Sequence, residues 1–122
     1  MKVMSIGIKS NKEAMKDFEE AFSAAQKRIP LRNKGGVFFT SLEAVRNFLT
    51  PKRLEILHEI KQKNPHSIYE LAKIMHRSFP SVLRDVELLT RHGLVTLTKS
   101  KKARKSVHPS VAYDAINLWI GI

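Results

Sequence analysis

Apolar and polar residues alternate at both ends of the chain, whereas the middle repeats its apolar residues at helical spacing. Every second residue is apolar over residues 4–8 and again over residues 116–120, which predicts a short strand near each end. We expect these outer strands to pair with each other or across a dimer. A third short strand is expected at residues 37–39, after a basic, glycine-containing linker.

The first half of the chain carries two capping boxes, in which a Ser or Thr precedes a Glu by three residues. Ser10 and Glu13 form the first box and predict a helix to about residue 28. Thr40 and Glu43 form the second and predict a short helix to about residue 49. The first helix has a stripe of phenylalanines and alanines, which needs a partner surface to cover it.

Three more helices are expected in the second half. Thr50 caps the first of them, with Pro51 at its first helical position. Ser67 and Ser78 cap the second and third, and Gly93 is expected as the left-handed cap that ends the third. The expected helices cover residues 51–63, 67–75 and 79–92.

After Gly93 the pattern becomes that of a β-hairpin. Residues 94–99 alternate as a strand, and residues 107–109 are expected to return beside them. All five basic residues C-terminal to Gly93 lie between Lys99 and Lys105, so the tip of the hairpin is strongly cationic. Two short helices on a tight turn, followed by such a hairpin, are typical of a winged helix-turn-helix, whose second helix enters the DNA major groove.

The expected fold is therefore mainly α-helical with a small β-hairpin, in the α+β class. It is a winged helix-turn-helix with an N-terminal strand–helix extension and a C-terminal strand. We expect residues 1–36 to form the extension, which would serve dimerisation, and residues 37–122 to form the DNA-binding domain. A chain of 122 residues is long enough for one such domain and too short for two.

The charge balance favours a polyanionic partner. The chain has 22 Lys and Arg against 11 Asp and Glu, a formal net charge of +11. Nucleic acid is the partner this excess favours most, although ribosomal, RNA-binding and membrane-surface proteins share it. Cysteine is absent, which excludes disulfides and thiolate metal sites. No apolar run approaches the ~18 residues of a membrane helix, and no signal peptide is evident, so we expect a cytoplasmic protein that has no membrane partner.

The segment from Ser78 to Val95 carries a Ser-x-Pro-Ser-Val-x-Arg motif, an apolar heptad and Gly-Leu-Val. It resembles the recognition helix of bacterial and archaeal winged-helix regulators of the MarR and ArsR type. Residues 50–57 and 67–72 resemble the first two helices of such a domain. The segment from Ser41 to Leu57, with the N-terminal strand and helix, is similar to a family of small MarR-like regulators, some of which are paired with a toxin gene. The resemblance implies a homodimer that binds double-stranded DNA by sequence, and we expect a repressor.

One group of candidate DNA-contacting residues lies in the turn and at the start of the third helix. These candidates are Arg77, Ser78, Pro80, Ser81 and Arg84. Arg84 can make a bidentate bond to guanine, and the serines can bond bases or phosphates. Ser78 can equally be a plain N-cap, and Arg84 can equally form a surface ion pair with Asp85 or Glu87.

Two apolar residues of the same helix start stand out. Phe79 is expected in the core. Leu83 stands where the regulator pattern usually has a polar residue, so we expect it to touch a thymine methyl group or a neighbouring helix.

The second group of candidates is the basic hairpin, which can grip phosphates. Its residues are Lys99, Lys101, Lys102, Arg104 and Lys105. Each cation that neutralises a phosphate releases condensed counterions, so binding should fall steeply with salt. The alternative is a solvated loop without a partner.

Dimerisation is the expected role of the apolar residues outside the winged helix. The candidates are Phe18, Phe22, Ala25 and Trp119. A second copy of the same stripe would cover the first helix, and homodimers read two half-sites about one helical turn apart. The alternative is packing of the helix on its own domain.

The sequence gives little support to catalysis. Its five histidines are dispersed, and it has neither a glycine-rich phosphate loop nor a nucleophile motif. We therefore expect no enzyme, no metal and no cofactor. Two other functions stay in competition: an antitoxin that neutralises a partner toxin and regulates its own operon, and an RNA-binding winged helix. The second lacks the exposed aromatic platform of single-stranded RNA readers.

Overall fold

The computed structural model describes residues 1–8, 16, 20, 37–99 and 107–122. They form two compact units, Met1–Phe48 with Tyr113–Ile122, and Leu49–Ala112. These units do not follow the expected boundary between residues 36 and 37. The reason is that the helix α2 (Leu42–Phe48) and the last strand, β5 (Ala115–Ile120), belong to the same unit as the N-terminal strand.

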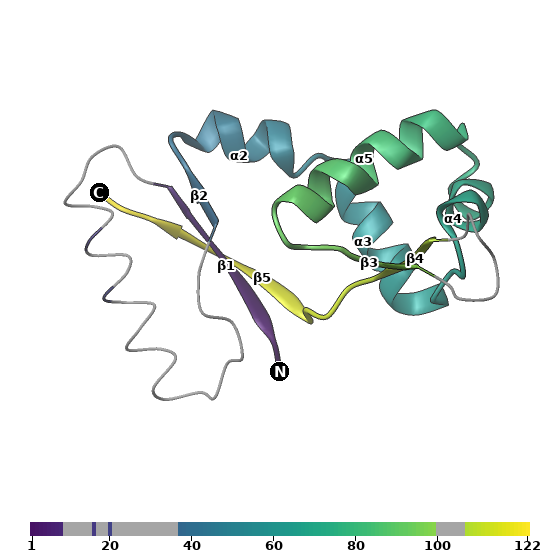
Figure 1. Ribbon diagram of the computed structural model, residues 1–122. Coiled ribbons are helices and arrows are strands. Elements are labelled where there is room, and N and C mark those ends of the chain that lie inside the picture. Colours follow the sequence, from purple (N-terminus) through teal and green to yellow (C-terminus); the bar gives the residue numbers. More distant parts are fainter. Residues whose placement is uncertain (9–15, 17–19, 21–36, 100–106) are drawn as a thin grey trace. The chain divides into compact units, whose positions relative to one another are not determined.

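The first unit contains a three-stranded parallel sheet. β1 (Val3–Ile8) lies between β2 (Val37–Phe39) and β5 (Figure 1). The two outer strands of the sequence therefore pair with each other within one chain, the first of the two expected alternatives. Central strands of parallel sheets are buried on both faces. This explains why β1 is buried at every residue from Met4 to Ile8, although its sequence alternates.

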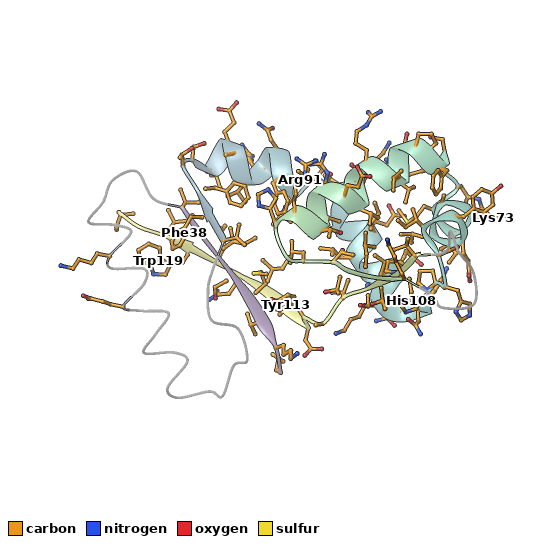
Figure 2. All side chains as sticks on the ribbon, viewed as in Figure 1. Phe38, Lys73, Arg91, His108, Tyr113 and Trp119 are labelled. Atoms are coloured by element: carbon orange, nitrogen blue, oxygen red, sulfur yellow. The ribbon has the colours of Figure 1, made fainter. Side chains whose placement is uncertain are left out.

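Gly7 in β1 has an aromatic register partner on each side, Phe38 in β2 and Trp119 in β5 (Figure 2). Register partners on adjacent strands project from the same face of a sheet. Since glycine has no side chain to pack, that face has room for both aromatic rings beside the central strand. Trp119 is thus half-buried within the sheet of its own chain.

The short helix α2 follows β2 directly. Ser41 is its cap, because Ser41 Oγ accepts a hydrogen bond from the Ala44 N–H at 3.1 Å. The expected start at Thr40 is therefore one residue early. Both residues carry the hydroxyl that a cap needs, so capping chemistry alone does not choose between them. The helix buries Phe48, whose ring centroid lies 5.2 Å from that of Phe39.

The second unit has the expected order of three helices and a hairpin. The elements are α3 (Pro51–Lys63), α4 (Ile68–Met75), α5 (Phe79–Arg91), β3 (Thr96–Lys99) and β4 (Val107–Ser110) (Figure 1). Each helix contributes fully buried residues to the core, namely Ile56, Leu71, Val82, Val86 and Leu89, all 0% exposed. The α+β class and the winged helix-turn-helix are confirmed. None of the described helices is long and apolar enough to cross a membrane.

The caps expected for α3 and α4 are present. Thr50 Oγ1 accepts from the N–H three residues on, and Asn64 ends α3 in the left-handed conformation, with φ 46°. Ser67 Oγ accepts from the Glu70 N–H at 3.0 Å. Glu70 reaches back one residue beyond the cap, where its carboxylate accepts from the His66 N–H at 3.1 Å. These caps satisfy backbone donors that the first turns leave without a helical partner.

Candidate nucleic-acid interface

Three residues, His76 to Ser78, join α4 to α5. His76 has a left-handed backbone, with φ 54°, and the Arg77 N–H bonds back to Ala72 O at 3.1 Å. Such a left-handed closure ends a helix sharply. Ser78 then caps α5: its Oγ accepts from the Ser81 N–H at 3.4 Å and lies 2.9 Å from Ser81 Oγ. The capping role expected for Ser78 is therefore confirmed.

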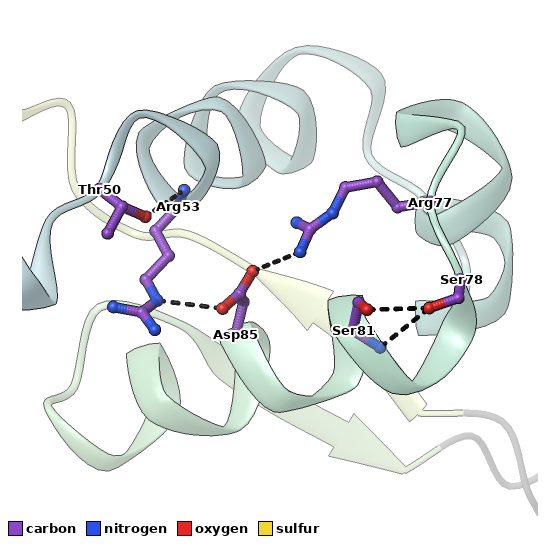
Figure 3. A network of polar contacts seen from close by, with 6 residues as sticks. All are labelled: Thr50, Arg53, Arg77, Ser78, Ser81 and Asp85. Atoms are coloured by element: carbon purple, nitrogen blue, oxygen red, sulfur yellow. Dashed lines mark hydrogen bonds and ion pairs between the residues drawn. The ribbon is translucent and has the colours of Figure 1, made fainter.

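The Asp85 carboxylate ties this turn to α3 (Figure 3). Its Oδ1 accepts from Arg53 Nε at 3.1 Å, and its Oδ2 accepts from Arg77 Nη2 at 2.9 Å. Asp85 is only 8% exposed, and the two arginine side chains are 18% and 19% exposed. Hydrogen bonds between ionised groups in a partly buried setting are about twice as strong as neutral ones. This Asp85 cluster therefore fixes the orientation of α5 against α3 and the turn.

The cluster bears on two of the expected DNA contacts, Arg77 and Arg84. Arg77 is turned toward Asp85 and is largely buried, so its role as a DNA contact stays a prediction. The alternative pairing of Arg84 with Asp85 does not occur, because Arg53 and Arg77 occupy the two carboxylate oxygens. Arg84 itself is exposed, and it makes no ion pair with any residue that the structure describes.

The outward face of α5 can be read from its buried residues. Val82, Val86 and Leu89 face the core, and a helix turns 3.6 residues per turn. A residue two positions before or after a member of this stripe lies on the opposite side of the helix. The residues on that side are Pro80, Arg84, Glu87 and Arg91, and all four are exposed. The structure thus places Pro80 and Arg84 together on the outward face of α5, with Ser78 and Ser81 at its N-terminal end.

The described part of the hairpin contains one of the basic candidates, Lys99. Lys99 ends β3, is exposed, and is the register partner of Val107 in β4. The other hairpin candidates, Lys101, Lys102, Arg104 and Lys105, lie outside the described residues, as do Phe18, Phe22 and Ala25.

Phe79 was expected in the core, and this prediction is wrong. The side chain is 39% exposed, and its ring centroid lies 5.9 Å from that of Tyr69, which is 61% exposed. Lys73 Nζ in turn lies 5.1 Å from the Tyr69 ring centroid. Phe79 stands at the first position of α5, on the flank of the buried stripe that begins at Val82. Sequence reasoning did not find Tyr69 or Lys73, whose only signal was an aromatic–cation spacing of four on a helix.

Metal binding has no visible basis in the described residues, which include no group of three or more His, Asp or Glu that could hold an ion. The ring centroids of His66 and His108 lie 6.4 Å apart, but no third ligand of this kind joins them among the described residues.

Three of the solved structures with a similar fold are bacterial proteins. YusO of Bacillus subtilis aligns with a TM-score of 0.51 and 23% identity, over 85% of this chain and 69% of that one. A MarR family protein of Bacillus stearothermophilus aligns with a TM-score of 0.47 and 14% identity, over 83% of this chain and 65% of that one. A MarR-like transcriptional regulator of Thermotoga maritima aligns with a TM-score of 0.47 and 17% identity, over 84% of this chain and 67% of that one. The chain spans about two thirds of the length of each. The likeness to YusO supports the fold alone.

The sequence comparison is more specific. No curated protein matches the chain. Residues 48–118, however, match the protein family HVO_A0114. The match covers the whole unit Leu49–Ala112, with its three helices and its hairpin, and more than half of the 122 residues. The chain therefore belongs to the HVO_A0114 family.

Proposed function

We propose that the chain is a transcriptional regulator that binds double-stranded DNA by sequence, with α5 in the major groove. The observation that carries this proposal is the exposed Arg84 beside the inward-held Asp85. Asp85 is engaged by Arg53 and Arg77, and among the described residues Arg84 makes no ion pair with Glu87 or any other carboxylate, so its guanidinium is available to an outside partner. An arginine on a recognition helix can bond guanine O6 and N7, worth about 1–3 kcal/mol of discrimination.

The N-terminal end of α5 supports the same orientation. Ser78 and Pro80 are exposed there, and Ser81 is half-buried. In helix-turn-helix proteins, the N-terminal residues of the second helix are the ones that contact base edges. Helix N-termini also attract phosphate through their free N–H groups. Arg77 stiffens the turn from within, which would keep these groups in place.

The basic hairpin would supply affinity independent of sequence. Lys99 is exposed at the end of β3, and four further cations follow it in the sequence. Their attraction to phosphates, with the net charge of +11, would hold the protein on DNA while α5 selects the site.

We further propose that the regulator is a homodimer and a repressor. Among the described strands, β5 lies at an edge of its sheet, and Leu118 and Ile120 on it are 43% and 50% exposed. A second copy at this edge would cover these residues on one face of the strand and Trp119 on the other, together with the stripe of Phe18, Phe22 and Ala25. Such a dimer presents two copies of α5 to two half-sites, and its presence on a promoter would exclude polymerase.

The second candidate is an antitoxin, and the same exposed edge favours it. A toxin could cover Leu118 and Ile120 in place of a second copy, while the second unit binds the operon's own DNA. Co-expression with the product of the adjacent gene, followed by purification through a tag on this chain, distinguishes the two. A stable complex would support the antitoxin, and recovery of the homodimer alone would reject it.

Fluorescence anisotropy tests the leading proposal. The purified protein is titrated onto its own upstream DNA and onto a scrambled duplex, across roughly 50–200 mM salt. We expect tighter binding to the upstream DNA that persists at the higher salt. Equal binding to both duplexes, lost together as salt rises, would show that the charge is a general anchor and would reject sequence-specific regulation.

A further inference from the structure

An apolar groove opens on the flank of α5, between that helix, the start of α4 and the hairpin. Its volume is about 240 Å³. The lining residues are Ser67, Ile68, Tyr69, Phe79, Leu83 and Val107. Five of these six are apolar or aromatic and none is acidic. The groove therefore offers mainly apolar contacts to a partner.

Two aromatic rings give the groove its wall. Tyr69 and Phe79 are 61% and 39% exposed and stand 5.9 Å apart between ring centroids, tilted by 44°. The pair spans α4 and α5, so it is held in place by the same three-residue turn that positions the recognition helix. The wall is therefore fixed relative to α5.

Positive charge borders the groove. Lys73 projects from α4 (Figure 2). Its Nζ lies over the Tyr69 ring, 5.1 Å from the ring centroid. Arg84 follows Leu83 in the sequence and is exposed, and Lys99 is the register partner of the lining residue Val107. A polyanion that also presents apolar groups complements an apolar groove with a basic border better than an apolar protein segment does.

The position of Leu83 indicates which chemical group would occupy the groove. On the surface of α5, Leu83 lies between the buried stripe and the outward Arg84, one turn after Phe79. When α5 lies in a major groove, this flank meets base edges. The only apolar group that base pairs present there is the 5-methyl group of thymine.

We propose that the groove, through Leu83 and Phe79, reads thymine methyl groups, so that the target half-site requires thymine beside the base pair contacted by Arg84. The proposal rests on the proposed function. It gives that function a second readout, which depends on an apolar contact and therefore differs from the hydrogen bonds of Arg84.

The experiment uses the full-length protein and a duplex selected from a random 20-base-pair library by repeated binding. Each thymine of the selected duplex is replaced in turn by deoxyuridine, which removes the methyl group and leaves the base pair intact. Burial of one methyl group corresponds to about 0.8 kcal/mol, so we expect binding to weaken about fourfold at one or two thymines. The Leu83→Ala and Phe79→Ala variants should bind the thymine duplex more weakly and lose the response to deoxyuridine.

Leu54→Ala is the matched control, because Leu54 is 44% exposed on α3 and does not line the groove. It should keep the fourfold response. A duplex that is selected but shows no methyl dependence would overturn this inference and leave the proposed function standing. A methyl dependence unchanged in both Leu83→Ala and Phe79→Ala would also overturn it, because the methyl group would then be read elsewhere. Failure to select any duplex over random DNA would overturn both.

Discussion

Arg77 donates from Nη2 to Asp85 Oδ2 at 2.9 Å, across the turn that separates α4 from α5. With Arg53 on the other oxygen, Asp85 is a buried anion held by two cations. Removal of one member of a buried charge group leaves its partners uncompensated and costs about 3 kcal/mol. We therefore expect Asp85→Ala to lower the free energy of unfolding by about that amount, as measured by urea denaturation followed by circular dichroism.

Glu87→Ala serves as the control for this substitution. Glu87 is an exposed acidic residue two positions further along the same helix, so its loss should change stability by less than about 0.5 kcal/mol. If both variants lose the same stability, the Asp85 cluster does not hold α5 in place.

Much of the fold could be predicted from local chemistry. The hydroxyl caps at Thr50, Ser67 and Ser78 each stand where a helix begins, because a cap is a contact between residues three apart in the sequence. The pairing of β1 with β5 could not be chosen in advance, since it joins residues more than a hundred positions apart and the alternation pattern allows either an intrachain or an intermolecular partner.

The site could be predicted in part only. Asp85 falls within the buried stripe of Val82, Val86 and Leu89, and a carboxylate there needs partners. The sequence does not say which cations supply them, because Arg53 and Arg77 come from other elements. Phe79 was misplaced for a related reason: a large apolar residue at the first position of a helix can fall on either side of the buried stripe.

Arg84→Ala tests the base contact proposed for α5. Loss of a bidentate contact should reduce discrimination between the upstream DNA and a scrambled duplex by about tenfold, within the 1–3 kcal/mol expected for such a contact. The measurement is the ratio of the two dissociation constants at fixed salt. Arg91→Ala removes an equal charge from the last turn of α5 and should leave the ratio unchanged. Equal weakening on both duplexes by Arg84→Ala would instead assign Arg84 to phosphate.

The hairpin cations should act on all DNA alike. Each phosphate contact contributes about 0.9 to the slope of log affinity against log salt, so the double variant Lys101→Ala/Lys102→Ala should lower that slope by about 1.8. Affinity for upstream and scrambled duplexes should fall together. Lys63→Ala is the control, because Lys63 pairs with Glu59 at 3.2 Å within α3. An unchanged slope in the double variant would show that the tip does not reach phosphate.

The exposed edge of the sheet carries the proposed dimer. Leu118 is 43% exposed on β5, and a carboxylate at this position would have to be buried without a partner if a second copy covered it. We therefore expect Leu118→Asp to convert the dimer to a monomer, as measured by sedimentation velocity. Binding to a duplex with two half-sites should then weaken by about a hundredfold or more, because the contact with the second half-site is no longer linked to the first. Leu42→Asp is the control, since Leu42 is 48% exposed on α2. If Leu118→Asp stays dimeric while Phe18→Asp/Phe22→Asp becomes monomeric, the dimer forms through the first helix and the edge of β5 is left for another partner.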